Sequence, residues 1–170
     1  MRSSFSLINV YSKKNIRSKV VTQLLYGDTF KKINKKNDWI KIKNDTDNYI
    51  GYIKKRKFPV NEKNTHKVCS LFALMFAKPN KGSKIKKRIS FSSRVKVTDK
   101  KNNFYKADGL WVKKKDLKKI NHKTKDIFKN IKKFTNVKYK WGGKHYAGVD
   151  CSGLIQLFFN FNNKFCPRDT

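Results

Sequence analysis

The residue of this chain best suited to covalent chemistry is a cysteine that stands between two glycines near the end of the sequence. Gly148 and Gly153 bracket Asp150-Cys151-Ser152. Because glycine tolerates backbone angles that other residues avoid, the chain can turn tightly there. Asp150 is also a favourable helix N-cap residue. The pattern therefore predicts that Cys151 lies in the first turn of a helix.

The residues that follow have the spacing of an amphipathic helix. Its apolar positions are Leu154, Ile155, Leu157, Phe158 and Phe161. A helix N-terminus carries about half a positive charge and unpaired amide donors. These would lower the pKa of the Cys151 thiol below its free value of about 8.5 and could hold an oxyanion during acyl transfer. The alternative is an unreactive cysteine that packs like a small apolar residue.

Four short blocks of sequence surround this cysteine in a fixed order. They are Tyr139-x-Trp141-Gly142-Gly143, Asp150-Cys151-Ser152-Gly153-Leu154, Gln156 and Pro167-Arg168-Asp169-Thr170. Over residues 121–170 the chain resembles the NlpC-type cysteine peptidases, which are papain-like endopeptidases of the cell wall. The resemblance implies that Cys151 is the nucleophile, that Asp150 and Ser152 help to hold the substrate, and that Tyr139 lines the site. It also implies hydrolysis of a γ-D-glutamyl bond to a diamino acid in peptidoglycan stem peptides.

The histidines depart from that family's pattern. The resemblance implies a general-base histidine downstream of the cysteine, but His66, His122 and His145 all precede Cys151. We therefore expect the base beyond Thr170 and interpret the chain as a truncated member that lacks the family's central sheet. His145 is interpreted as an exposed turn histidine in preference to a catalytic base. Without the sheet, the apolar helix face should be exposed, loosely packed or buried against the preceding domains.

Short strands separated by turn residues are predicted upstream. Their positions are residues 20–25, 29–33, 39–42 and 49–53. Such strands at close spacing indicate a small barrel. The pattern Gly27-Asp28, Trp39-Ile40-Lys41-Ile42 and Gly51-Tyr52-Ile53 resembles bacterial SH3-like domains, which in such peptidases bind wall peptide or close one side of the cleft.

A second, divergent copy of this module is predicted downstream. A shift of 65 residues places residues 29–41 on residues 94–106, and a shift of 59 places residues 52–55 on residues 111–114. The smaller shift indicates a shorter loop in the second copy. We interpret Trp39 and Trp111 as core aromatics, with ligand stacking as the alternative.

The predicted fold class is α+β, with two small SH3-like β-barrels followed by the helical N-terminal part of a papain-like cysteine peptidase domain. The boundaries are residues 1–60, 61–120 and 121–170. Residues 127–134 have helical apolar spacing with Thr124 as a possible N-cap. We favour a packing helix there over a membrane-surface helix.

The composition is strongly basic. The chain has 43 Lys and Arg residues against 11 Asp and Glu, a net charge of +32, which attracts polyanions at low salt. Lysine dominates and is spread along the chain, whereas bidentate phosphate and base contacts favour arginine. We therefore explain the high positive charge by codon bias from an AT-rich genome in preference to attraction to an anionic envelope. Binding to nucleic acid is the least favoured of the three explanations. The expected partners are peptidoglycan stem peptides or their recycled fragments, and the oligomeric state is left open.

The cysteines indicate neither a disulfide framework nor a metal site. Cys69, Cys151 and Cys166 form an odd set without C-x-x-C spacing, and we expect no cofactor. Cys69 is expected to be buried in the apolar run at residues 68–77, which is too short to span a bilayer. Because residues 1–10 lack a signal-peptide pattern, we expect a cytoplasmic protein, or a periplasmic or envelope protein if sequence precedes Met1.

Two functions of different classes follow from these patterns. The first is a cysteine peptidase of the NlpC type that is incomplete in this chain. The second is a non-catalytic protein whose paired SH3-like domains bind wall peptides or another polyanion.

Overall fold

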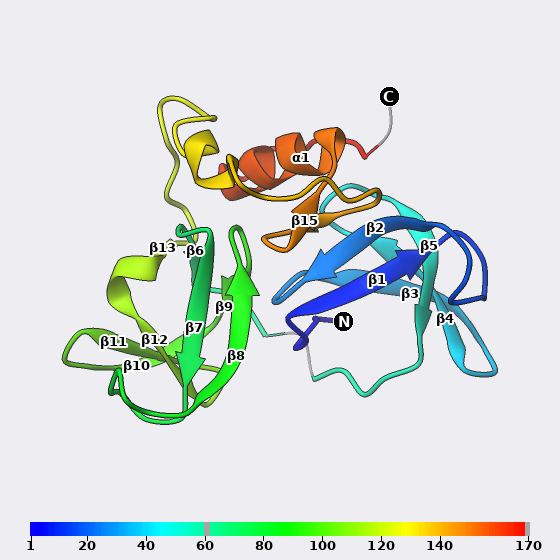
Figure 1. Cartoon of the computed structure of the whole chain (residues 1–170). Coiled ribbons are helices and arrows are strands. Elements are labelled where there is room, and N and C mark those ends of the chain that lie inside the picture. Colours follow the sequence, from blue (N-terminus) through cyan, green and yellow to red (C-terminus); the bar gives the residue numbers. More distant parts are fainter. Residues whose placement is uncertain (60–61, 169–170) are drawn as a thin grey trace.

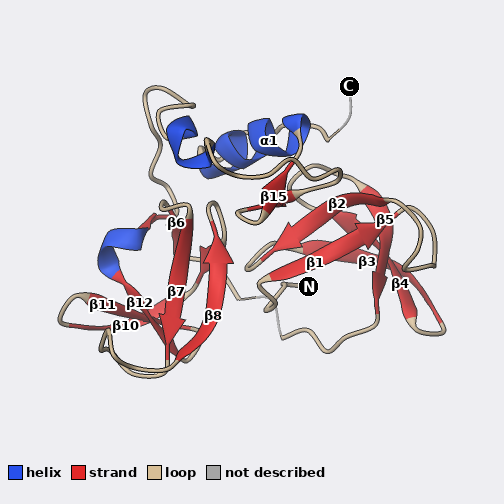
Figure 2. Ribbon diagram, in the orientation of Figure 1, coloured by secondary structure: helices blue, strands red, loops and turns tan. Residues whose placement is uncertain are grey.

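The computed structural model describes residues 1–59 and 62–168. That part of the chain is mostly β-structure with one α-helix (Figures 1 and 2). Figure 1 shows two sheets side by side, with α1 (Cys151–Phe161) lying across one end of both. The predicted domain boundary at residues 60–61 lies outside the described residues.

The first sheet contains the four strands predicted from the sequence and one more. Its strands are β1 (Leu7–Tyr11), β2 (Val20–Leu25), β3 (Phe30–Lys36), β4 (Trp39–Asn44) and β5 (Ile50–Lys54). Their order is β2-β1-β5-β4-β3, with antiparallel neighbours. Alternate side chains such as Ile8, Val10, Ile40 and Ile42 are buried in one core, as expected for a sheet with one covered face. Trp39 is 9% exposed and contacts Tyr11 edge-to-face, which agrees with its predicted core role.

The second sheet repeats this topology. Its strands are β7 (Phe72–Phe76), β8 (Ile85–Ser90), β10 (Val97–Lys101), β11 (Phe104–Ala107) and β12 (Leu110–Lys113). The order β8-β7-β12-β11-β10 matches that of the first sheet strand by strand. Asn37 and Asn102, which are 65 positions apart, occupy the two equivalent turns with φ of 54° and 48°. Asparagine tolerates this left-handed conformation better than most residues. The predicted repeat is therefore present in the structure.

Smaller elements complete the chain. They are β6 (His66–Val68), β9 (Arg94–Val95), β13 (Leu117–Lys119), β14 (Lys144–His145), β15 (Gly148–Val149) and 3-10 helices at Lys114–Asp116 and Ile131–Phe134. Strand β6 pairs with β13 and β9, and β14 pairs with β15.

The sheets are open, so the predicted closed barrels are not confirmed. In the first sheet, β2 meets the cysteine segment and does not close onto β3. The Arg168 Nε donates to the Val21 carbonyl oxygen at 3.1 Å. The backbone of Gly142 lies so close that a Cβ there would be 2.2 Å from the Val20 carbonyl oxygen, and its φ is +71°. Only glycine is suited to such a close approach at positive φ.

The prediction of a helix at residues 127–134 is wrong. The segment consists of turns and the 3-10 helix Ile131–Phe134. Lys125, Lys129 and Lys133 would stand four residues apart on one α-helical face, where like charges repel. Thr124 donates from its amide and hydroxyl to the Asn162 side-chain oxygen at 2.7 and 3.0 Å and does not act as an N-cap.

Helix α1 covers a core to which both modules contribute side chains. Leu157, Phe158 and Phe161 are buried with Leu25 from the first sheet and Phe91 from the second module. Of the three outcomes predicted for the apolar helix face, burial against the preceding modules is the one observed, although Ile155 remains 43% exposed. Within residues 1–59 and 62–168, no helix is long and apolar enough to cross a membrane.

Candidate functional site

Cys151 is the first residue of α1, and its side chain is exposed. Asp150 has extended backbone angles and accepts a hydrogen bond from the Gly153 amide at 2.7 Å, so the predicted N-cap is confirmed. The first intrahelical bond joins the Leu154 amide to the Asp150 carbonyl oxygen at 2.9 Å. The amides of Cys151 and Ser152 therefore have no intrahelical acceptor and are free to bind a negative oxygen near the thiol.

The Asp150 carboxylate is the organising group of the site. It forms a bidentate ion pair with Arg168, in which Nη1 donates to Oδ1 at 2.8 Å and Nη2 contacts Oδ2. Oδ2 also accepts from the Gly142 amide at 2.8 Å. Because Asp150 is 7% exposed and both oxygens have partners within the protein, it fixes the turn, the helix start and Arg168 together. Its predicted substrate contact stays a prediction.

Two hollows flank the thiol and share Tyr139, Asp150 and Cys151 in their linings. One, of about 170 Å³, is also lined by Lys19, Val21, Tyr49, Trp141, Ser152 and Arg168. The other, of about 240 Å³, is otherwise apolar and is lined by Phe134, Val137, Val149 and Leu154. A substrate could therefore extend in two directions from the sulfur. The first sheet contributes to the lining of one of the two hollows.

The predicted site residues Tyr139, Cys151 and Ser152 come together around these hollows. Tyr139 is 68% exposed and is held by a bridge to Val149. The Ser152 hydroxyl lies 3.4 Å from Asp150 Oδ1. Trp141 belongs to the first block of the sequence motif, where no role was predicted for it, and its side chain is 66% exposed.

Three polar residues that line the first hollow, Arg168, Lys19 and Tyr49, were not predicted from the sequence. Arg168 also stands in the motif, and its pairing with Asp150 was not predicted. Lys19 and Tyr49 had no local signal, because they precede Cys151 by 132 and 102 positions and only folding brings them to it. Asp169 and Thr170, the end of the fourth block, lie outside the described residues.

His145 is buried, so its predicted place in an exposed turn is wrong. It is 6% exposed in β14, its ring contacts Tyr146, and its Nδ1 accepts from the Ala147 amide at 3.3 Å. Burial, with a smaller contribution from Lys140, lowers the pKa of His145 to about 4. In the described part of the chain no histidine lines either hollow at Cys151.

This buried histidine predicts a pH dependence of stability. The folded pKa of about 4 lies below the unfolded value of about 6.5, so the unfolded state takes up a proton first as the pH falls. Neutral His145 therefore makes its full contribution to the free energy of unfolding above pH 6.5. About 3 kcal/mol of this contribution is lost when the pH falls to 4. Urea denaturation from pH 7 to pH 4 should show this loss. His145→Phe replaces the imidazole with an aromatic ring that does not titrate, so the free energy of unfolding of this variant should fall by about 3 kcal/mol less between pH 7 and pH 4. An equal fall in the variant and the parent would contradict the assignment.

The cysteines should differ in reactivity. Cys69 is half-buried, with its Sγ 3.4 Å from the Lys115 carbonyl oxygen, and burial raises its pKa. Cys151 is exposed at a helix N-terminus. We expect iodoacetamide to label Cys151 at least about tenfold faster than Cys69 at pH 7. Mass spectrometry of the time course measures both rates in one sample, and equal rates would remove the argument for activation by the helix terminus.

Two regions of the chain match known protein families. Residues 6–57 match the bacterial SH3 domain, and residues 136–170 match the NlpC/P60 family. The first match covers the first sheet, and the second covers the segment that carries Cys151. The two resemblances drawn from the sequence are thereby confirmed.

Two similar proteins come from Bacillus cereus. The first is the gamma-D-glutamyl-L-lysine dipeptidyl-peptidase of strain ATCC 10987 / NRS 248, which is 21% identical over 179 residues, covering 90% of this chain and 54% of the relative. The chain thus spans about half the length of that curated relative. The second is the crystal structure of an NlpC/P60 family protein from B. cereus ATCC 10987. It aligns with a TM-score of 0.82 at 17% identity, over 99% of this chain and 74% of that one. The fold is therefore that of an NlpC/P60 protein.

Proposed function

We propose that this chain provides the nucleophile and part of the substrate cleft of a cell-wall cysteine peptidase. The observation that carries the proposal is the exposed Cys151 thiol at the start of α1, between two hollows. The match of residues 136–170 to the NlpC/P60 family supports it. The name of the B. cereus relative supports a γ-D-glutamyl-L-lysine bond as the target, and the resemblance to the NlpC-type peptidases implies that this bond lies in peptidoglycan stem peptides.

In the proposed reaction the Cys151 thiolate attacks the carbonyl carbon of the γ-glutamyl amide. A C–S bond forms, and the carbonyl electron pair moves to oxygen, where the first-turn amides of α1 would stabilise the charge. The C–N bond then breaks, the amine leaves with a proton, and water hydrolyses the thioester. The proposal places the proton-transferring base outside the described residues, because the resemblance implies a histidine downstream of the cysteine.

A substrate-shaped electrophile tests the nucleophile without requiring that base. L-Ala-γ-D-Glu carrying a chloromethyl ketone at the γ-carboxyl should alkylate Cys151, as the thiolate displaces chloride. Peptide mapping should find the adduct at Cys151, with Cys69 as an internal control, and free L-Ala-γ-D-Glu-L-Lys should slow the labelling. Equal labelling of both cysteines, or labelling that the tripeptide does not slow, would contradict the proposal.

Hydrolysis provides the complementary measurement. The tripeptide should remain intact with the 170-residue chain and be cleaved by a longer chain that adds a histidine beyond Thr170. Cleavage by the 170-residue chain that survives Cys151→Ala would show that another group is the nucleophile. Tripeptide binding without any labelling of Cys151 would favour the non-catalytic alternative.

A further inference from the structure

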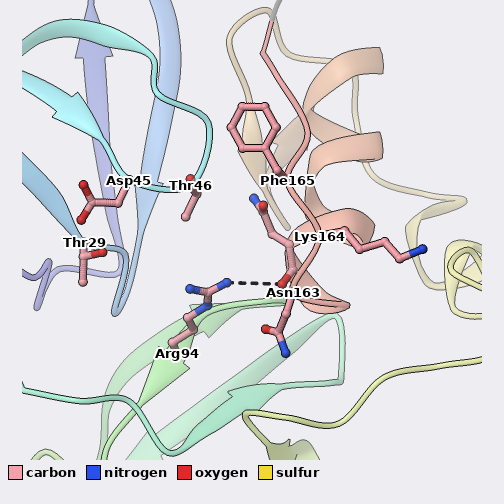
Figure 3. Close-up of a pocket in the computed structure, with 8 residues that line it drawn as sticks. Thr29, Asp45, Thr46, Arg94, Asn163, Lys164 and Phe165 are labelled. Carbon is pink, nitrogen blue, oxygen red and sulfur yellow. Dashed lines mark hydrogen bonds between the residues drawn. The ribbon is translucent and has the colours of Figure 1, made fainter.

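The turn between β4 and β5 brings the first module, which contains the first sheet, into contact with the end of the chain. Figure 3 shows Thr46 of this turn opposite residues 163–165, which follow α1, and both line a cavity of about 290 Å³. The next residue of the turn, Asp47, contacts α1 itself. Its Oδ2 accepts a hydrogen bond from Gln156 Nε2 at 3.3 Å. A side chain of the first module thus bonds directly to the helix that begins at Cys151.

Both partners of this hydrogen bond are buried. The other oxygen of the carboxylate, Asp47 Oδ1, accepts from the Tyr49 amide at 3.0 Å, which fixes the side chain within its own turn. Lys144 of β14 is buried as well, and its Nζ lies 3.7 Å from Asp47 Oδ2. A hydrogen bond to a charged acceptor is stronger than one between neutral groups, and a buried donor cannot replace it with water. The contact between Asp47 and Gln156 should therefore hold the turn and the helix in one arrangement.

Gln156 extends this contact to the segment that holds the N-cap of α1. Its Nε2 also donates to the Cys166 carbonyl oxygen at 3.1 Å, two residues before Arg168. Arg168 in turn pairs with Asp150, the N-cap residue. Because a fixed carbonyl at Cys166 restricts where the next residues can lie, the first module restricts the position of Arg168 and, through it, the start of α1.

The start of α1 sets both the direction of the Cys151 thiol and the place of the first-turn amides. A displacement of about 1 Å between reacting groups can lower a rate about a hundredfold. Neither Asp47 nor Gln156 is among the described residues that line the two hollows at the thiol, so both would act at a distance. We propose that Asp47 is a positioning residue for Cys151 and acts through Gln156. The first module is then a structural part of the peptidase site and not a separable binding domain. This inference rests on the peptidase function proposed for Cys151.

The test measures alkylation of Cys151 in the 170-residue chain by the L-Ala-γ-D-Glu chloromethyl ketone. Asp47→Asn removes the charge but keeps an oxygen for the Tyr49 amide, and Gln156→Met removes the amide donor at nearly the same volume. Each should lower the limiting alkylation rate, kinact, about tenfold and leave the half-saturating concentration, KI, within about twofold. Iodoacetamide needs no oriented site, so its rate at Cys151 should also stay within about twofold. The double variant should lose no more than either single variant, because both substitutions break one link.

Two controls separate positioning from a general loss of stability. Val112→Ala removes a side chain buried in the core of the second module, so it should lower the melting temperature and leave kinact unchanged. Lys144→Met breaks the ion pair with Asp47 but keeps the hydrogen bond from Gln156, and should likewise leave kinact unchanged. An equal fall of kinact in Val112→Ala and Asp47→Asn would overturn the proposal, because it would show an effect of stability alone.

The remaining outcomes distinguish this proposal from the function on which it rests. If Asp47→Asn does not fold, Gln156→Met alone decides the question. An unchanged kinact in Gln156→Met, or a rise in KI without a fall in kinact, would overturn the positioning role while Cys151 remained the nucleophile. Failure of the chloromethyl ketone to alkylate Cys151 selectively in the parent chain would contradict the peptidase function and the positioning role together.

Discussion

Asp150→Ala is expected to lower the free energy of unfolding by about 3–5 kcal/mol. Asp150 and Arg168 are 7% and 4% exposed, so the substitution leaves a buried guanidinium without its counter-charge. The amides of Gly142 and Gly153 lose acceptors at 2.8 and 2.7 Å, and α1 loses its N-cap. Because these losses occur around one turn, the orientation of Cys151 should be lost together with stability.

Urea denaturation of the variant and the parent measures this effect. Asp150→Asn keeps an oxygen for the cap and removes the charge, so its loss should be smaller. Glu62→Ala is the matched control, because Glu62 forms an exposed ion pair with Lys96 at 3.2 Å and should cost less than about 1 kcal/mol. Similar losses for Asp150→Ala and Glu62→Ala would show that the buried pair does not hold the site together.

Phe91→Ala is expected to cost about 3–5 kcal/mol. Phe91 is fully buried, and its ring lies 4.8 Å from that of Phe161, 5.2 Å from that of Phe158 and 5.7 Å from that of Phe134. Its removal opens a cavity between the second module and α1. The helix should therefore loosen before the sheets do.

Hydrogen exchange tests where the stability is lost. The amides of α1 should lose protection in Phe91→Ala, while those of β4 and β5 in the first sheet should keep theirs. Phe165→Ala removes a ring that is 58% exposed and should change stability by no more than about 0.5 kcal/mol. An evenly distributed loss of protection would mean that α1 and both sheets unfold as one unit.

Several elements were predictable because their signals are local. The strand at residues 20–25 coincides with β2, the equivalent asparagine turns recur 65 positions apart, and Asp150 caps α1 as its residue type indicates. Strand β1 was missed, because Leu7–Tyr11 offers little beyond a short apolar alternation. The segment at residues 127–134 shows the limit of periodicity, since the same apolar spacing that suggests an α-helix also allows Phe134 to pack from a 3-10 helix.

The sequence by itself determined that Cys151 begins a capped helix and that two related β-modules precede it, because capping and turn formation depend on neighbouring residues. Only the tertiary structure decided which charged groups are buried. Lys67 and Lys144 are 0% and 1% exposed in a chain with 43 basic residues, and their sequence contexts do not distinguish them from exposed lysines. The Lys67 ammonium donates to the His122 carbonyl oxygen at 2.6 Å and to that of Phe161, at the last turn of α1. Burial depends on such distant partners, which come together only when the modules pack, and the same packing places Lys19 and Tyr49 beside Cys151.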